Sequence, residues 1–383
     1  MNERVAIVGV GWSGFRPFTP DQSYKELMYE AAVRAYADAG VDPRRDVDSF
    51  VTVAEDFHEG TSIFDEYVPD QIGAALKSVH TIPGDGLHGL ATAYMMIRTG
   101  QFDVVAVEGH SKASNLLTLP EVTAYAQDPV LNRPLRLNTH FVAGLEMQRY
   151  LFETGTSREE CAAVVVKNRQ NALRNTLASF GADLTLDDVL SGPLLSTPLG
   201  MRETAEHVDG AIVMVLASGD KANALSENPI WIHGMGWCNG SASLESREWS
   251  RAPYLHKAAQ MAYRQAGISN PLDVVDFAEV DDTYAYKELQ ALEELGLFGP
   301  GMAGEITASG GTSFDSDLPV NPSGGSLGVG YMLDATGLMR TLEAVMQLRG
   351  EAGQHQLEGV EAGLVQSWRG VPTTSGAVAV LSN

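Results

Sequence analysis

The chain repeats itself at long range, and this limits the folds open to it more than any other feature. Residues 5–12, Val-Ala-Ile-Val-Gly-Val-Gly-Trp, are echoed by residues 230–237, Ile-Trp-Ile-His-Gly-Met-Gly-Trp. Each copy is an apolar strand pattern that ends in Gly-x-Gly-Trp. The copies start about 225 residues apart, far beyond the periods of solenoid repeats. The repetition therefore indicates a duplicated domain.

The match continues beyond the first strand. Residues 30–40 are echoed by residues 257–267, with apolar residues at helical spacing and a glycine as the stop. The next strand patterns, within residues 46–53 and 273–280, fall in register as well. One β-α-β unit is thus used twice. Strands that alternate with helices predict two parallel-type sheets covered by helices.

The region between the copies has another character. Residues 114–198 are poor in strand patterns, and we expect an inserted, mainly helical loop domain whose clearest helix is 158–174. A strand over 209–217 closes the first half. The expected division is therefore 1–113 and 199–225 for the N-terminal half, 114–198 for the insertion and 226–383 for the C-terminal half.

Charge and composition limit the kinds of molecule that the chain is expected to bind. The net charge of −23, with no run of Lys and Arg, opposes binding to nucleic acid or to an anionic membrane, but not binding of a small anion by local cations. No apolar stretch suits a signal peptide or a membrane span, so we expect a cytoplasmic protein. The two cysteines, Cys161 and Cys238, are too few for a disulfide framework and badly spaced for zinc, so no metal site is predicted.

One motif suggests a nicotinamide cofactor. Residues 9–14 fit the Gly-x-Gly-x-x-Gly pattern of a dinucleotide site. That site needs a helix that begins at the turn and directs its N-terminus at the pyrophosphate. Here Pro17 and Pro20 follow, and the helical pattern begins only near Ser23. We therefore favour a structural role for these glycines over a dinucleotide site.

A family resemblance rests on several stretches taken together. The chain resembles the thiolase superfamily, in particular the sterol-carrier-protein type, at residues 97–109, 166–175, 209–211, 289–297 and 320–325. The resemblance implies an α/β thiolase fold, with duplicated βαβαβαββ halves, helices that sandwich two mixed sheets, and an inserted helical loop domain.

Each place where a thiolase keeps its chemistry is altered. The segment of the nucleophilic cysteine falls on Pro83-Gly84-Asp85-Gly86, and proline has neither a thiol nor a backbone N–H. The Gly-His-Pro motif falls on Gly330-Tyr331-Met332, and the His or Asn of another motif falls on Asp281. The C-terminal Cys-x-Gly segment falls on residues 369–376, which contain no cysteine. This register excludes Claisen condensation and thiolysis through a cysteine.

The replacements resemble the thiolase-superfamily aldolases that cleave the side chain of steroid CoA thioesters. That resemblance implies a retro-aldol split of a β-hydroxyacyl-CoA into a ketone and propionyl-CoA. It implies Tyr331 and Tyr284 as an acid/base pair, with the two roles left open between them, and Asp281 and Asp85 as groups that orient a tyrosine or a water. Substrate binding is expected at Gly324, Gly325, Gly330 and His88.

Alternatives remain at this point. The chain could be a non-catalytic CoA-binding or assembly subunit, or another acyl-CoA acyltransferase of the family. Tyr286 competes with Tyr284, because residues two apart on an extended segment share a face. Asp282 and Asp334 lie near the same motifs, and solvated or capping roles suit them equally. His110 and His140 are each isolated in the sequence, which is more typical of structural histidines.

The resemblance also implies partners. It predicts an acyl-CoA as substrate with no further cofactor, and a homodimer formed through the N-terminal sheet. It adds a small OB-fold partner subunit, which gives a heterotetramer and would hold any zinc.

Overall fold

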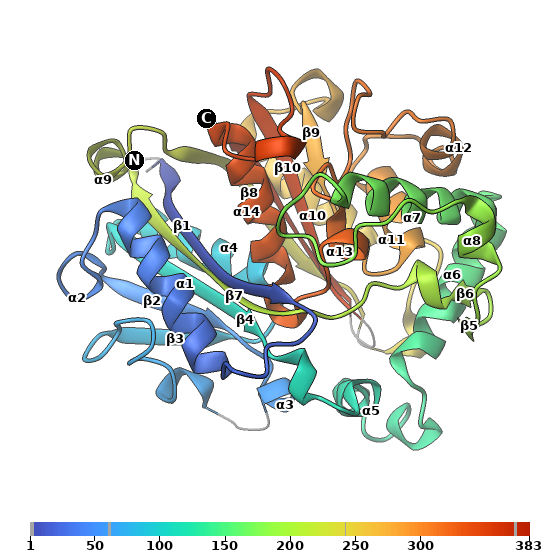
Figure 1. Cartoon of the computed structure of the whole chain (residues 1–383), viewed down its shortest axis with the longest axis horizontal. Helices are drawn as coiled ribbons and strands as arrows, with labels where there is room; N and C mark the ends of the chain where they lie inside the picture. Colours follow the sequence, from blue (N-terminus) through green and yellow to red (C-terminus); the bar gives the residue numbers. More distant parts are fainter. Residues whose placement is uncertain (1–3, 60–62, 242, 371–373) are drawn as a thin grey trace.

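A mixed sheet of nine strands forms the centre of the computed structural model, which describes residues 4–59, 63–241, 243–370 and 374–383 (Figure 1). In spatial order the strands are β3 (Ser78–Ile82), β2 (Ser49–Val53), β4 (Val104–Ser111), β7 (Asp209–Ser218), β1 (Val5–Arg16), β8 (Ile230–Asn239), β11 (Ser375–Ser382), β10 (Ala362–Arg369) and β9 (Phe277–Glu279).

The duplication is confirmed in space. The order β1-β7-β4-β2-β3 of the first half is repeated as β8-β11-β10-β9 in the second. Where a fifth strand would follow, Val320 makes a single parallel bridge to Ala278. The two half-sheets meet at a short seam, where Ala6 pairs with Trp231 and Ile7 with Ile230.

The half-sheets are mixed, as the family resemblance implied. The alternation of strands and helices predicted parallel-type sheets, and this holds only for the outer pairs β2–β3, β2–β4 and β9–β10. Around the centre, β1, β7, β8 and β11 run antiparallel to their neighbours. The difference arises because β7 follows the long insertion and β11 follows β10 without a crossover helix.

Helices cover both outer faces and separate the two half-sheets. The helix α1 (Tyr24–Ala39) packs on β1 and β7, and its counterpart α10 (Pro253–Ala266) packs on β8 and β11. Between the half-sheets, α4 (Gly86–Arg98) packs against α14 (Thr336–Arg349). The central core contains Leu87, Leu90, Leu338 and Leu342 of these two helices, all fully buried.

The glycines of the Gly-x-Gly-Trp repeats allow close contact between strand and helix. An added Cβ would lie 2.2 Å from the Ala31 carbonyl oxygen at Gly11 and 2.0 Å from the Ala258 carbonyl oxygen at Gly236. The strand β1 runs on through the motif to Arg16, and α1 begins only at Tyr24, so no helix N-terminus faces this turn. The structural reading is therefore supported over the dinucleotide site.

The insertion is mainly helical. It contains α5 (Leu119–Thr123), α6 (Thr139–Thr154), α7 (Arg158–Ala172), α8 (Leu186–Leu190) and the strand β5 (Leu194–Ser196), which pairs with β6 (Leu199–Gly200). The helix α7 packs against α8, α11 (Ala285–Glu294), α12 (Ala303–Ala308) and α13 (Gly325–Gly328). Short helices α2 (Pro43–Asp46), α3 (Asp56–Glu59) and α9 (Gly219–Leu225) complete the chain. Among the described residues, no helix combines the length and apolar character needed to span a membrane.

Candidate active site

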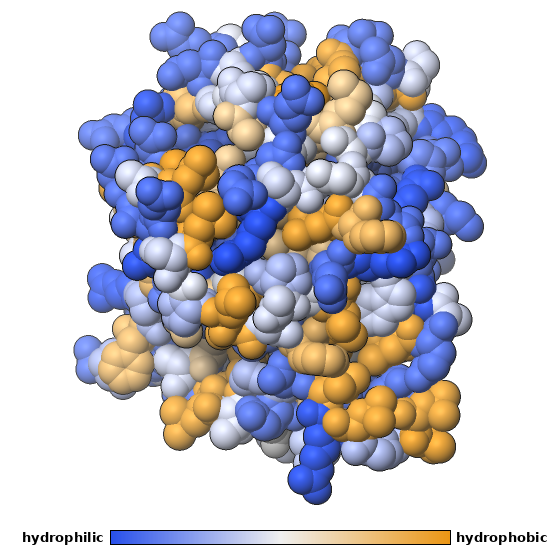
Figure 2. All heavy atoms as spheres, turned by 90° about the vertical axis from the view of Figure 1, so that its right-hand side faces the viewer, coloured by the Kyte–Doolittle hydropathy of each residue, from blue (hydrophilic) through white to orange (hydrophobic). Residues whose placement is uncertain are grey.

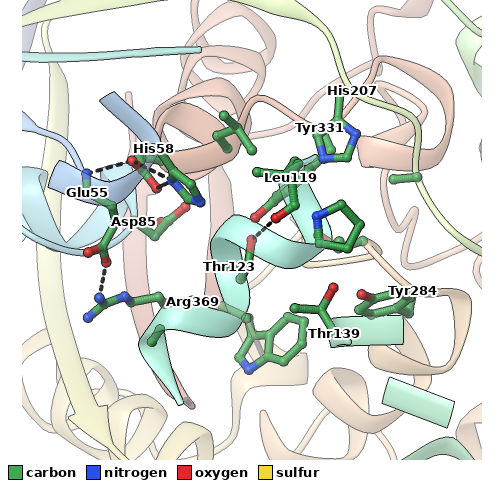
Figure 3. Close-up of a pocket in the computed structure, with 18 of the residues that line it drawn as sticks. Glu55, His58, Asp85, Leu119, Thr123, Thr139, His207, Tyr284, Tyr331 and Arg369 are labelled. Carbon is green, nitrogen blue, oxygen red and sulfur yellow. Dashed lines mark hydrogen bonds and ion pairs between the residues drawn. The ribbon is translucent and has the colours of Figure 1, made fainter. Parts of the chain in front are cut away.

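A cavity lies where both halves and the insertion meet, and it encloses about 100 Å³ (Figure 3). Its walls come from the residues that follow parallel strands β2, β3, β9 and β10, which is the edge where ligands bind in open α/β sheets. The insertion closes one side with α5 and the start of α6. The lining segments are 55–58, 84–85, 119–126, 139–140, 204–207, 283–284, 331–334 and 368–370.

Two of the predicted residues, Tyr331 and Tyr284, line this cavity together. The short segment before β7 forms backbone hydrogen bonds to the loops of both tyrosines. The Ala205 N–H donates to the Thr283 carbonyl at 2.9 Å, and the Val208 N–H donates to the Tyr331 carbonyl at 3.1 Å. The chain before β7 thus ties the two tyrosine-bearing loops to one edge of the sheet.

Both phenols keep their protons at neutral pH. Burial raises the pKa of Tyr331 well above its usual range, and the nearby carboxylate of Asp334 is the next cause. Burial also raises the pKa of Tyr284 far above 10. The Tyr284 hydroxyl lies 3.5 Å from His140 Nδ1, and the Tyr331 ring lies 5.3 Å from the His207 ring, centroid to centroid. These phenols are suited to donate a proton or a hydrogen bond, not to act as a base.

The choice between Tyr284 and Tyr286 is settled by local structure. The extended segment ends at Tyr284, α11 begins at the next residue, and the two rings stack with centroids 6.1 Å apart. The Tyr286 hydroxyl donates to Glu146 Oε2 at 2.8 Å and does not line the cavity. Tyr284 is therefore the phenol available to a ligand.

Asp85 lies on the cavity wall, with both oxygens engaged by backbone. It caps α4 by accepting from the Leu87 N–H at 2.9 Å and holds α14 by accepting from the Gly337 N–H at 2.8 Å. Burial raises its pKa to about 6. Asp85 thus joins the two central helices, two residues after Pro83, where the sequence analysis placed the lost nucleophile.

Asp281, which was predicted to orient a tyrosine or a water, does not line the main cavity. Its carboxylate pairs with the fully buried Arg340 at 3.0 Å and accepts from the Thr283 N–H at 3.0 Å. Asp282 accepts from the backbone N–H groups of Ser326 and Leu327 at 2.6 and 3.0 Å. Both carboxylates hold the loops that carry the tyrosines, and neither lines this cavity.

The predicted substrate-binding residues also lie outside the cavity. An added Cβ at Gly324 would meet the Ala172 Cβ at 2.6 Å, and one at Gly325 would meet the Asp282 Oδ2 at 2.2 Å. Gly330 has a φ of 127° and lies against Val208. These glycines thus serve the packing of backbone. His88 lies within α4, and burial lowers its pKa to about 4.

Several lining residues escaped the sequence analysis. His58 Nδ1 lies 3.2 Å from Asp334 Oδ1, and the Glu55 N–H donates to Asp334 Oδ2 at 2.8 Å (Figure 3). Arg369 forms an ion pair with Glu55. His140 was taken as a structural histidine and lies beside Tyr284 instead.

His207 was also missed. Burial is the main cause that lowers its pKa to about 4, so the imidazole is neutral at pH 7. The signal available in the sequence was its place two residues before the Asp209-Gly-Ala segment. No local pattern joins these three histidines, because they come from three separate parts of the chain.

Neither cysteine lies at the cavity. Cys161 is buried in α7 within an apolar cluster, and burial raises the pKa of its thiol. Cys238 lies near the end of β8. Part of the C-terminal segment where thiolases carry a second cysteine, residues 371–373, lies outside the described residues, and its sequence is Val-Pro-Thr. Within the described part of the chain, no cluster of His, Cys, Asp and Glu could hold a metal ion.

Comparison with known proteins agrees with this architecture. Residues 238–383 match the thiolase C-terminal domain-like family. The chain is 30% identical over 384 residues to the acetyl-CoA acetyltransferase of Methanothermobacter thermautotrophicus, covering 98% of each. It is 28% identical over 389 residues to the 17-hydroxy-3-oxo-4-pregnene-20-carboxyl-CoA lyase of Mycobacterium tuberculosis, again covering 98% of each.

A solved structure described as an Ltp2-ChsH2(DUF35) aldolase superimposes with a TM-score of 0.85. The alignment has 28% sequence identity and covers 99% of this chain and 97% of that one. The chain belongs to the thiolase superfamily, among the proteins that resemble the thiolase part of sterol carrier protein 2. The family predicted from the sequence is thereby confirmed.

Proposed function

We propose that this chain is a lyase that splits a β-hydroxyacyl-CoA by retro-aldol cleavage, giving a ketone and a shorter acyl-CoA, without a covalent intermediate. The observation that carries the proposal is the composition of the cavity: two protonated phenols and three imidazoles line it, and no thiol does. Retro-aldol chemistry needs a base for the hydroxyl proton, stabilisation of the thioester enolate and an acid that protonates the enolate.

The raised pKa values of the two phenols favour one assignment of catalytic roles. Tyr331 and Tyr284 were expected to share the acid and base roles, but burial keeps both phenols protonated. Tyr331 then donates the proton that the enolate carbon takes up, and Tyr284 donates a hydrogen bond to the thioester oxygen. The proposal thus uses both tyrosines as donors.

Acyl transfer is less compatible with this site. Thiolase-type transfer passes the acyl group to a thiolate on the enzyme. Cys161 is sealed in an apolar cluster, and Cys238 does not line the cavity. The acyl transfer named for the archaeal relative is therefore less compatible with this cavity than the cleavage named for the mycobacterial lyase.

We propose that the acyl chain of the substrate is attached to a bulky ring system, of the kind named for the mycobacterial lyase. Cleavage then leaves a ketone on the ring and releases propionyl-CoA. The enclosed space suits the reacting carbons, and the half-exposed Leu119, Pro120 and Arg369 mark the side through which a larger group would extend. A substrate of this kind requires no resident cofactor.

We also propose a small partner subunit of the DUF35 type, together with a homodimer formed through the N-terminal sheet. The similar solved structure is described as an Ltp2-ChsH2(DUF35) aldolase, which supports the DUF35-type subunit. Exposed apolar side chains are frequent on the insertion, and Figure 2 shows orange groups on the face to which the insertion belongs. They include Leu117, Tyr125, Val130, Leu131, Leu135 and Phe152. Such exposed apolar groups are typical of interaction sites.

The test is a product analysis. The full chain, alone and co-expressed with a DUF35-type subunit, is incubated with a 17-hydroxysteroid carboxyl-CoA and with simpler β-hydroxyacyl-CoAs. We expect equal amounts of ketone and shorter acyl-CoA by mass spectrometry. Binding of the acyl-CoA without cleavage of any of them would contradict the proposal and favour a non-catalytic binding subunit.

A further inference from the structure

His207 presents an imidazole to the cavity without a bonding partner from the protein. The side chain lines the cavity beside Tyr331, and the centroids of the two rings are 5.3 Å apart (Figure 3). Among the described residues, neither ring nitrogen of His207 has a hydrogen-bond partner. His140 differs, because its Nδ1 lies 3.5 Å from the Tyr284 hydroxyl. The hydrogen-bonding capacity of His207 is therefore left for a ligand.

The backbone on both sides of this imidazole is tied to the loops of the two tyrosines. The Tyr331 N–H donates to the Glu206 carbonyl at 2.7 Å, and the Val208 N–H donates to the Tyr331 carbonyl at 3.1 Å. Earlier in the same segment, Thr204 forms an antiparallel bridge to Tyr284. The imidazole is thus fixed relative to both phenols before a substrate binds, as an effective hydrogen-bond donor in an active site requires.

The imidazole of His207 is suited to donate a hydrogen bond and not to act as a base. Burial is the main cause that lowers its pKa to about 4, and the nearby His140 and His58 are smaller causes. A nitrogen that takes up a proton so weakly is a poor acceptor for the proton of a β-hydroxyl group. A neutral imidazole still carries one N–H, which can donate to an oxygen that gains negative charge.

The proposed reaction needs such a donor next to Tyr331. As the Cα–Cβ bond breaks, its electron pair passes into the thioester, and negative charge develops on the thioester oxygen. This oxygen and the Cα that Tyr331 protonates are bonded to the same carbonyl carbon, so the groups that act on them must be neighbours. Pro83, in the segment of the lost nucleophile, has no backbone N–H to donate. His207 is a neighbour of Tyr331 and has an N–H.

We propose that His207 is a catalytic hydrogen-bond donor to the thioester oxygen and that it forms the oxyanion hole of the site together with Tyr284. This role rests on the proposed retro-aldol function. Two donors then share the charge of the enolate, one before α11 and one before β7. His207 keeps its proton throughout, so its role adds no proton transfer to the reaction.

The experiment compares His207→Phe and His207→Gln in the full chain, alone and with the DUF35-type subunit. Phenylalanine keeps an aromatic ring beside Tyr331 but has no donor, whereas the glutamine amide retains an N–H. His233→Phe is the matched control, because His233 lies on β8, outside the cavity, and bonds the Ser382 hydroxyl at 2.8 Å. Thermal unfolding of each variant shows whether the fold is retained.

Two quantities are measured for each variant. The first is the rate of cleavage of the β-hydroxyacyl-CoA. The second is the infrared carbonyl band of a bound analogue that cannot be cleaved, namely the same acyl-CoA without its β-hydroxyl group and with carbon-13 at the thioester carbonyl. A hydrogen bond to the carbonyl oxygen lowers the wavenumber of this band, so the band reports the donor directly.

We expect His207→Phe to lower kcat by about 100-fold or more, because one donor to the oxyanion is lost. KM should change less, since the hydrogen bond strengthens as charge develops on the oxygen. The carbonyl band of the bound analogue should move to higher wavenumber in His207→Phe, and His207→Gln should recover part of both the rate and the band position. His233→Phe should match the wild-type chain in both.

Cleavage by His207→Phe at close to the wild-type rate would overturn this role of His207 and leave the lyase function in place. A lowered rate with an unmoved carbonyl band would also overturn it, because a merely structural defect leaves the polarisation of the carbonyl unchanged. Absence of cleavage by the wild-type chain, alone and with the subunit, would instead contradict the proposed function itself.

Discussion

At the scale of single residues, the environment of each side chain decides what it can do. Tyr331 and Asp85 are both placed on the cavity wall by the loops of the central sheet. The Asp85 oxygens accept from the N-termini of two helices, whereas the Tyr331 phenol has no backbone hydrogen-bond partner among the described residues. Asp85 therefore joins two helices, whereas the proposed function has Tyr331 contact the substrate.

Tyr331→Phe should reduce kcat for β-hydroxyacyl-CoA cleavage by about 100-fold or more, because the proton donor to the enolate is lost. KM should change little, since the ring still fills the same wall. Steady-state kinetics provide the measurement. Tyr29→Phe is the control, because Tyr29 is exposed on α1. Equal activity of the two variants would contradict the role of Tyr331.

A cysteine-free chain, Cys161→Ala/Cys238→Ser, should keep its activity. Neither thiol lines the cavity, and the expected cost is about 1 kcal/mol of stability from the truncated core residue. The measurement is kcat beside the melting temperature. A folded double variant that had lost cleavage would show that a thiol takes part after all.

At the scale of elements, the two halves use the same device to pack a helix on a strand. Gly9 and Gly11 of β1 lie against α1, and Gly234 and Gly236 of β8 lie against α10. In each case an added Cβ would fall within 3 Å of helix backbone. The Gly-x-Gly repeat thus allows close helix–strand contact in both halves of the chain.

Gly11→Ala should destabilise the chain by about 3 kcal/mol, because the new methyl group would lie 2.2 Å from the Ala31 carbonyl oxygen. Chemical denaturation measures the loss. Gly219→Ala is the matched control, since its nearest neighbour would be 3.4 Å away at the Arg4 Cβ. A Gly11→Ala chain of normal stability would refute the packing explanation, and nicotinamide binding at this turn would revive the alternative.

Glu279, the last residue of β9, makes the free energy of unfolding depend on pH between about 4.5 and 8. Burial, followed by the charge of Glu343, raises its pKa from 4.5 to about 8. The folded chain therefore holds this proton more tightly than the unfolded chain. The stabilisation is complete below about pH 4.5 and is lost as the pH rises through about 8.

Replacing Glu279 by Gln should remove this loss, because an amide resembles the protonated acid. The melting temperature of Glu279→Gln should rise relative to wild type between about pH 4.5 and pH 8, the window between the unfolded and the folded pKa. Glu305→Gln, at an exposed position on α12, is the control. Parallel melting curves for Glu279→Gln and wild type across this range would exclude the explanation.

At the scale of the whole molecule, the site exists because three parts of the chain converge. The N-terminal half supplies His58 and Asp85, the C-terminal half supplies Tyr284 and Tyr331, and the insertion closes the cavity with α5. The sheet also ends in an edge strand, β3, which pairs with β2 alone among the described strands. Ser78 and His80 are exposed on this strand.

The proposed homodimer through this sheet predicts a solution mass near twice 41.1 kDa. Ser78→Lys/His80→Lys should shift the chain toward the monomer, because like charges would meet across the paired edges. Light scattering after size exclusion measures the mass. Gln101→Lys/Gln354→Lys, with both residues exposed elsewhere, should leave the dimer in place. An unchanged dimer in the first variant would place the interface on another surface.

The sequence by itself determined the duplication, the family and the loss of the cysteine nucleophile, because these are written in spacing and residue type. It also singled out Tyr284, Tyr331 and Asp85, which line the cavity, since family motifs mark their positions. Only the tertiary structure decided the rest. The pairing of His58 with Asp334 joins residues 276 positions apart, and the turning of Asp281 toward buried Arg340 depends on loop geometry. The directions of side chains and the distances between them follow from tertiary packing, and no local sequence pattern encodes them.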